Sequence, residues 1–144
     1  MAGLSLVEML IALVIISVGL LGMAGLQAYS LRMNTSAYHR TQANTLAYDI
    51  LDAMRTNRTT ALAGGYDVDV SGSFSGGGQA ASDLGDWLAM LDYLLPFGAG
   101  EVACDNATEM CRVRVLWDDS RALTSGSCST SPDSCQQLTV SSRL

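Results

Sequence analysis

An uncharged apolar run near the N-terminus constrains this chain more than any other feature. Met9 to Leu26 comprises 18 residues with no charged side chain and a single hydroxyl group. A helix of that length covers about 27 Å, close to the hydrocarbon thickness of a bilayer. Because an open chain in lipid satisfies its backbone groups only as a helix, the run predicts a membrane-spanning helix. A cleavable signal peptide is the alternative, but no Lys or Arg precedes the run and no clear small-x-small site follows it.

Charge is distributed unevenly along the 144 residues. Glu8 is the one charged side chain from Met1 to Leu31, whereas the other 13 acidic residues and all 8 arginines lie beyond it. The formal charge of −6 and the absence of lysine argue against a nucleic-acid interface, which needs a basic face. Nearly half of the residues are apolar, which excludes a disordered chain. The sequence therefore predicts an apolar anchor followed by an ordinary soluble module.

Glu8 stands immediately before the apolar run. An ionised carboxylate in a membrane costs a few kcal/mol without a partner, so it suggests a functional role. The alternative is an acid that marks a helix N-terminus, where the helix dipole favours negative charge. The order Gly3, then Leu4-Ser5-Leu6-Val7-Glu8, then the apolar run resembles the class III signal of type IV pilins and pseudopilins. In that superfamily a peptidase cuts after the glycine, and the next residue becomes the methylated N-terminus.

The resemblance implies a role for three residues. Gly3 would be the cleavage glycine, Leu4 the methylated N-terminal residue and Glu8 the fifth residue of the mature chain, whose carboxylate pairs with the amine of a neighbouring subunit. Residues 1–3 would then be a remnant of the leader, although family leaders carry basic residues and the first mature residue is usually phenylalanine. Such pairing would remove two isolated charges from low dielectric and set the register between subunits.

Helical periodicity continues beyond the membrane segment. No Pro or Gly interrupts Leu26 to Thr60, so the sequence predicts one helix over Leu4–Arg58. Residues 4–26 would be the membrane and filament-core segment, and residues 27–60 the amphipathic segment. Gly64-Gly65 would end it. Its expected apolar stripe consists of Leu26, Tyr29, Met33, Ala37, Asn44, Ala47, Leu51 and Met54. Glycines 19, 22 and 25 predict either close packing of membrane helices or local melting on assembly.

Residues 61–144, here called the head, predict a small α+β module. Tyr66–Val70 alternates like a short strand, and residues 71–81 have the composition of a flexible loop. Ser82-Asp83 resembles an N-cap, followed by a helix with Leu84, Trp87, Leu88, Leu91 and Leu95 on one face. Three runs then predict an antiparallel sheet packed on the long helix: Glu101–Cys104, Cys111–Trp117 and Gln136–Ser142.

The four cysteines lie in the head. Three pairings can be drawn, and we favour Cys104–Cys111 across a hairpin and Cys128–Cys135 before the last strand. Disulfides indicate an oxidising compartment, whereas four free thiols in a cytoplasmic head are the alternative. The cysteine spacings are not those of a zinc site, and Asp67, Asp69 and Asp83 lack a calcium-loop pattern and are interpreted as solvated acids. With one histidine, predicted on the long helix, we expect no metal, no cofactor and no catalytic activity.

Segments within Asp83 to Arg121, DLGDWLAMLDYLLPFGAGEVAC and VRVLWDDSR, resemble the PilV group of minor pilins, also called type IV pilus modification proteins. The resemblance implies a pilin fold and a low-abundance subunit without catalytic activity. It would prime pilus assembly in a tip complex with other minor pilins and would be able to present an adhesin. The implied partners are the other minor pilins, the major pilin, the prepilin peptidase and the inner-membrane assembly machinery. Head loops at Cys104–Cys111 and Ser120–Cys135 would contact neighbouring subunits.

The resemblance also implies a location, the inner membrane with a periplasmic head before assembly and the pilus tip afterwards. Two other functions remain open. One is a minor pseudopilin of a type II secretion system, which shares the sequence features up to about Arg58 and often binds calcium in its head. The other is a single-pass anchored periplasmic protein that binds an unrelated partner. The mass of the mature chain separates the anchored protein from the pilin-like classes, because only a pilin-like protein would start at a methylated Leu4.

Overall fold

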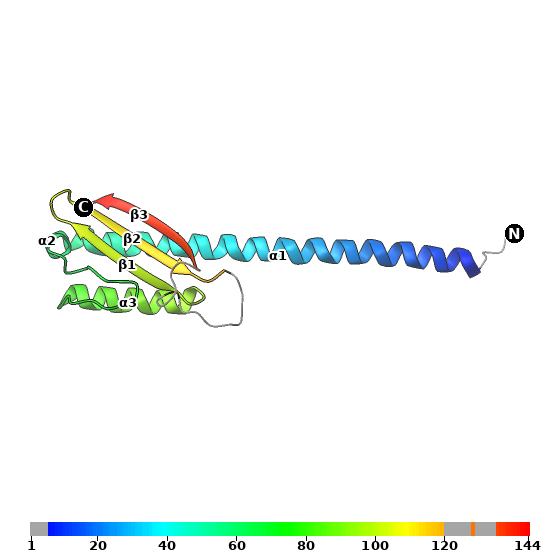
Figure 1. The fold of residues 1–144 in the computed structure, drawn as a ribbon, viewed down its shortest axis with the longest axis horizontal. Helices are drawn as coiled ribbons and strands as arrows, with labels where there is room; N and C mark the ends of the chain where they lie inside the picture. Colours follow the sequence, from blue (N-terminus) through cyan, green and yellow to red (C-terminus); the bar gives the residue numbers. More distant parts are fainter. Residues whose placement is uncertain (1–5, 120–127, 129–134) are drawn as a thin grey trace. The chain divides into compact units, whose positions relative to one another are not determined.

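The computed structural model describes residues 6–119, 128 and 135–144 (Figure 1). Its elements, in chain order, are α1 (Leu6–Thr56), α2 (Arg58–Leu62), α3 (Gln79–Leu94), β1 (Ala99–Asp105), β2 (Met110–Trp117) and β3 (Gln136–Arg143). The chain divides into two compact units, residues 1–37 and residues 38–144. Helix α1 therefore contributes its first part to one unit and its last turns to the other.

The second unit has two layers. The last turns of α1 and helix α3 form one layer, and a three-stranded antiparallel sheet in the order β1-β2-β3 forms the other (Figure 1). This is the predicted α+β architecture, with a long helix packed against a small sheet and a second short helix. The strand predictions are confirmed to within two residues at each end, because alternation of buried and exposed side chains identifies a half-covered sheet.

The core forms where these layers meet. Its α1 residues recur at steps of three and four and are Ala43, Leu46, Ala47, Ile50, Leu51 and Met54. Leu84, Trp87 and Leu91 of α3, Val102 of β1 and the inward residues of β2 also belong to it. The predicted stripe is confirmed at Ala47, Leu51 and Met54. It is wrong at Asn44, which is exposed, because the neighbouring Ala43 faces the core instead.

Two predicted helix boundaries are wrong. The long helix ends at Thr56, and the separate α2 begins at Arg58, because Asn57 leaves helical geometry with φ −119° and ψ 48°. The Thr60 hydroxyl donates to Asn57 Oδ1 at 2.7 Å, a local interaction of the kind by which Asn competes with helix hydrogen bonds. Helix α3 begins at Gln79 rather than after Ser82-Asp83, because Gly78, at φ 63°, takes the N-cap position one turn earlier.

The expected strand over Tyr66–Val70 is also wrong. Only Val68 makes bridge pairs, one with Phe74 and one with Val102 of β1. The Val68 and Val102 N–H groups each donate to the other's carbonyl at 3.0 Å, so Val68 is the one residue of the segment that pairs with the edge of β1 through backbone hydrogen bonds. Tyr66 and Val68 are nevertheless buried, which explains why the segment alternates like a strand.

Candidate functional site

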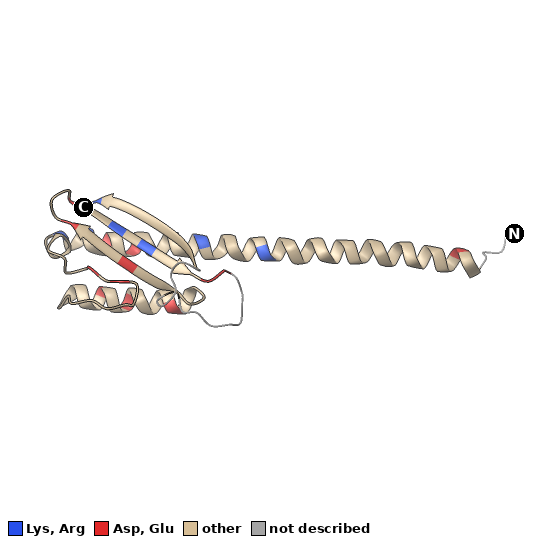
Figure 2. Cartoon of the chain, in the orientation of Figure 1, with Lys and Arg blue, Asp and Glu red and all other residues tan. Residues whose placement is uncertain are grey.

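The first feature with functional meaning is the exposed apolar surface of α1 in the first unit. From Leu6 to Leu31 its large apolar side chains are exposed, for example Leu6 at 84% and Leu26 at 73%. Figure 2 shows the long uncharged stretch of this helix that follows the acidic residue near its N-terminal end. By length and composition α1 can cross a membrane, although a signal sequence would pass the same test. This part of the chain is therefore a candidate membrane anchor.

Glu8 lies in the first turn of α1 and is exposed. Within the described part of the chain its carboxylate has neither a hydrogen bond nor an ion pair. Placement in a first turn is favourable for an acid, because the helix dipole is positive there. Gly3 and Leu4, the predicted cleavage site and methylated residue, lie outside the described residues. The proposed pairing of Glu8 with the amine of a neighbour therefore stays a prediction.

The three glycines of the apolar segment lie within regular helix. A Cβ added at Gly19, Gly22 or Gly25 would meet no atom within 4 Å beyond the local helix backbone. No described residue therefore requires a glycine at these three positions. The free space along this face leaves room for close approach of a second helix, whereas local melting on assembly stays a prediction.

All four cysteines are oxidised, in the two favoured pairs Cys104–Cys111 and Cys128–Cys135. Cys104 and Cys111 are directly opposite each other in the β1–β2 ladder, with Cα atoms 4.1 Å apart. The Cys128–Cys135 pair packs on Ala99 and Leu116, which form a small second cluster. Disulfides are typical of proteins in oxidising compartments. Most of the predicted contact loop over residues 120–135 lies outside the described residues.

The prediction that Asp67 and Asp83 are only solvated acids is wrong. Both aspartates form hydrogen bonds that hold parts of the head together. Asp67 Oδ1 accepts the Cys104 backbone N–H at 3.0 Å and so attaches the segment after α2 to strand β1. Asp83 Oδ2 accepts the Tyr66 hydroxyl at 2.5 Å, and Asp83 Oδ1 accepts the Gln79 amide at 2.7 Å. Burial, and then the bond to Asp83, raises the pKa of Tyr66. No sequence signal exists for the Tyr66–Asp83 and Cys104–Asp67 bonds, because they join residues 17 and 37 positions apart.

Two other aspartates cap turns. Asp69 Oδ1 accepts the Ser71 hydroxyl and the Ser73 N–H, and Asp105 accepts the Ala107 N–H and the Thr108 hydroxyl. The bond from the Ser71 side chain is the main reason that the pKa of Asp69 lies below its usual value. The bond from Thr108 does the same for the pKa of Asp105. These are local turn motifs typical of Asp followed by Ser, Thr or Asn.

The single histidine and a metal site are the remaining candidates. His39 lies on α1, and its ring centroid is 5.9 Å from that of Tyr38. Among the residues that the structure describes, no group of three His, Cys, Asp or Glu side chains is placed to hold a metal ion. The described features of functional interest are therefore the exposed apolar part of α1, the acid in its first turn and the two disulfides of the head.

No protein-family model, curated protein or solved structure matches this chain.

Proposed function

We propose that this protein is a minor pilin, a PilV-like subunit that helps to prime the assembly of a type IV pilus. The observation that carries the proposal is the first part of α1, where a single carboxylate precedes an exposed apolar surface. A plain membrane anchor has no need of an acid at its start, because the carboxylate adds to the cost of insertion. Pairing of Glu8 with a neighbouring chain would explain both why this acid is present and why it stands at the start of the apolar surface.

Assembly would use this helix twice. In the inner membrane it would hold the unassembled subunit, with the head in the periplasm. After the prepilin peptidase cuts between Gly3 and Leu4, the assembly machinery would move the helix from lipid into the core of the filament. There Glu8 would pair with the Leu4 amine of an adjacent subunit, and the apolar side chains would exchange lipid contacts for contacts with neighbouring helices.

The head would then select partners. Two disulfides and a core shared with the last turns of α1 stabilise it, which suits contacts with other minor pilins and the major pilin. We place this subunit at the tip of the pilus, where the complex can also present an adhesin. No catalytic role is part of this proposal.

The proposal is tested by removing only the charge of Glu8. Glu8→Gln keeps the size of the side chain and should leave membrane insertion intact, because Gln is easier to bury in lipid than an ionised Glu. Loss of one member of a buried ion pair costs about 3–5 kcal/mol, and each 1.4 kcal/mol is a factor of ten. In the native host, the amount of the variant in sheared surface filaments should fall at least about tenfold, while its amount in membranes stays at the wild-type level.

Asp92→Asn is the matched control. Asp92 is an exposed residue of α3 that lies outside both predicted contact loops, and this substitution also removes one carboxylate charge. This variant should enter filaments as the wild type does. Equal incorporation of Glu8→Gln and the wild type would contradict the pairing. A wild-type protein present in membranes and absent from filaments would instead favour the single-pass anchor, and one found in a secretion pseudopilus would favour the pseudopilin.

A further inference from the structure

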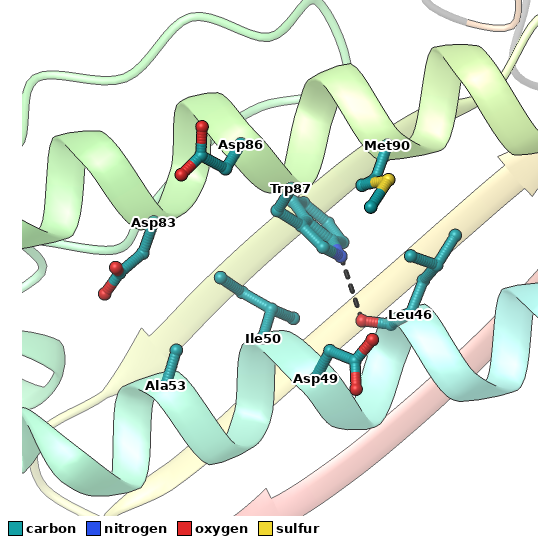
Figure 3. A pocket seen from close by; sticks show the side chains of 8 residues that line it. All are labelled: Leu46, Asp49, Ile50, Ala53, Asp83, Asp86, Trp87 and Met90. Carbon is teal, nitrogen blue, oxygen red and sulfur yellow. Dashed lines mark hydrogen bonds between the residues drawn. The ribbon is translucent and has the colours of Figure 1, made fainter.

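A hollow, here also called the groove, opens on the second unit between the last turns of α1 and helix α3 (Figure 3). Its volume is about 260 Å³. Leu46 and Ile50 of α1 and Trp87 of α3 give it an apolar floor, and the half-exposed Met90 lies at its rim. Trp87 is fixed there, because its indole N–H donates to the Leu46 carbonyl at 2.9 Å. The floor is therefore a preformed apolar surface.

Carboxylates line both walls of this hollow. Asp49 comes from α1, whereas Asp83 and Asp86 come from α3 (Figure 3). Asp83 is already engaged by Tyr66 and Gln79. Asp49 and Asp86 are exposed, and neither has a hydrogen bond or ion pair to any other described residue. Two unpaired charges thus flank an apolar floor.

The wider charge distribution has the same sign. Helix α3 carries three aspartates and no basic residue (Figure 2). Residues 38–144 contain 13 acidic residues and 7 arginines, a formal charge of −6. Arg55, on the neighbouring turn of α1, is held by Asp52 at 2.5 Å. The electrostatic field of this face therefore attracts cations and repels a second copy of the same unit.

The size of the hollow narrows the choice of ligand. Sites for small molecules and cofactors usually span about 300–1,000 Å³, so this hollow is small for them. A long cationic side chain matches it better, because the aliphatic part lies on apolar surface while the charged end stays near carboxylates and water. Arginine fits best, since its planar guanidinium both stacks on aromatic rings and forms forked hydrogen bonds to carboxylates.

We propose that this groove docks an arginine side chain of a basic segment on a different protein. The side chain would lie along Met90 and Trp87, with its guanidinium between Asp49 and Asp86. The inference depends on the second unit alone, so it holds whether or not the chain enters a filament. If the proposed function is correct, the basic segment belongs to another subunit of the assembly.

The test uses the full-length chain, labelled with ¹⁵N, in micelles of a nonionic detergent. Its two tryptophans give two indole N–H signals, of which Trp87 lies in the groove and Trp117 does not. The probe is acetyl-Ala-Arg-Ala-Arg-Ala-amide, and its control carries citrulline, a neutral analogue of the same shape, at both arginine positions. We expect a saturable shift of the Trp87 signal alone, with at least about tenfold weaker binding of the citrulline peptide and weakening by added salt.

Two variants of α3 provide a matched pair. Asp86 lines the groove, whereas Asp92 lies on the same helix outside it, and both are exposed. Asp86→Asn and Asp92→Asn change the net charge equally, so a general electrostatic effect would act on both alike. We expect the dissociation constant to rise about three- to fivefold for Asp86→Asn and to stay within about 1.5-fold for Asp92→Asn. An unchanged Trp117 signal verifies that each variant is folded.

Several results would overturn the inference. The Trp87 signal would not shift, or both peptides would shift it equally, or Asp92→Asn would weaken binding as much as Asp86→Asn. A shift that appears on raising the protein concentration without peptide would assign the groove to a second copy. Saturation by Ca²⁺ alone, with no response to the peptide, would make it a metal site.

Discussion

Gly100 of β1 provides the sharpest test of how α3 packs on the sheet. The residue is buried, and a Cβ placed on it would lie 2.6 Å from Leu91 Cδ1 and would overlap the Trp87 indole. Both neighbours are core residues of α3, and Trp87 is also held by its hydrogen bond to Leu46, so neither can move away freely. Forcing an extra carbon into such a packed core costs about 1–3 kcal/mol. Gly100→Ala should therefore lower the free energy of unfolding by that amount.

Gly85 provides the matched control, because the same substitution there should act in the opposite direction. This glycine lies on the exposed side of α3, and a Cβ added to it meets nothing within 4 Å. Alanine stabilises a helix interior by about 0.5–1 kcal/mol relative to glycine. Gly85→Ala should therefore raise the free energy of unfolding.

Urea titration of the full chain in nonionic detergent measures both variants. Trp87 and Trp117 are the only tryptophans, so their fluorescence follows the unfolding of the second unit and not of the apolar helix. With an m-value of about 2 kcal/mol per molar urea, the midpoint should fall by about 0.5–1.5 M for Gly100→Ala and rise by about 0.3–0.5 M for Gly85→Ala. Equal midpoints for Gly100→Ala and the wild type would show that Trp87 does not pack against β1 as described.

Three further predictions concern the head. The raised pKa of Tyr66 means that the folded state holds this proton more tightly than the unfolded state, so the contribution of Tyr66 to stability should be constant from pH 7 to about pH 10 and should be lost above it. Tyr66→Phe should remove that alkaline fall and, by losing the bond to Asp83, lower stability at pH 7 by about 1–3 kcal/mol, as urea midpoints from pH 7 to 11 would reveal. The pKa of Asp105 is lowered, so the stabilising contribution of this residue is present above its unfolded pKa of 3.8 and is lost as the pH falls through its folded pKa. Asp105→Asn should therefore reduce the loss of stability below pH 4. Identical dependence of stability on pH in the variant and the wild type would be evidence against this. Reduction of both disulfides should lower the free energy of unfolding by about 2–5 kcal/mol, and an unaltered thermal midpoint after reduction would refute their stabilising role.

Much of the fold could be predicted because its signals are local. Alternation identified the three strands, and steps of three and four identified the buried face of α3. The cysteine pairing followed from expecting a hairpin between the first two strands, and the ladder places Cys104 opposite Cys111. Each of these features depends on residues close together in the sequence.

The errors arose where tertiary contacts or one backbone conformation decided the structure. Tyr66 and Val68 are buried without belonging to a strand, so alternation reported their burial and not their secondary structure. The break at Asn57 and the early start of α3 after Gly78 depend on backbone angles that the pattern of apolar residues does not encode.

The groove was missed for a related reason. Asp49 and Asp86 lie on different helices, and only the packing of α3 against α1 brings both residues to the lining of one groove. In the sequence each is an ordinary solvent-facing acid on an amphipathic helix. The available signal was the composition of α3, which has three aspartates and no basic residue to pair with them.

The most direct measurement is the intact mass of the chain isolated from the membranes and from the sheared filaments of its native host. A pilin-like subunit would lack residues 1–3 and would carry one methyl group on the amine of Leu4 in both fractions. An unprocessed and unmethylated chain, found in membranes and never in filaments, would contradict the proposal that this protein is a filament subunit.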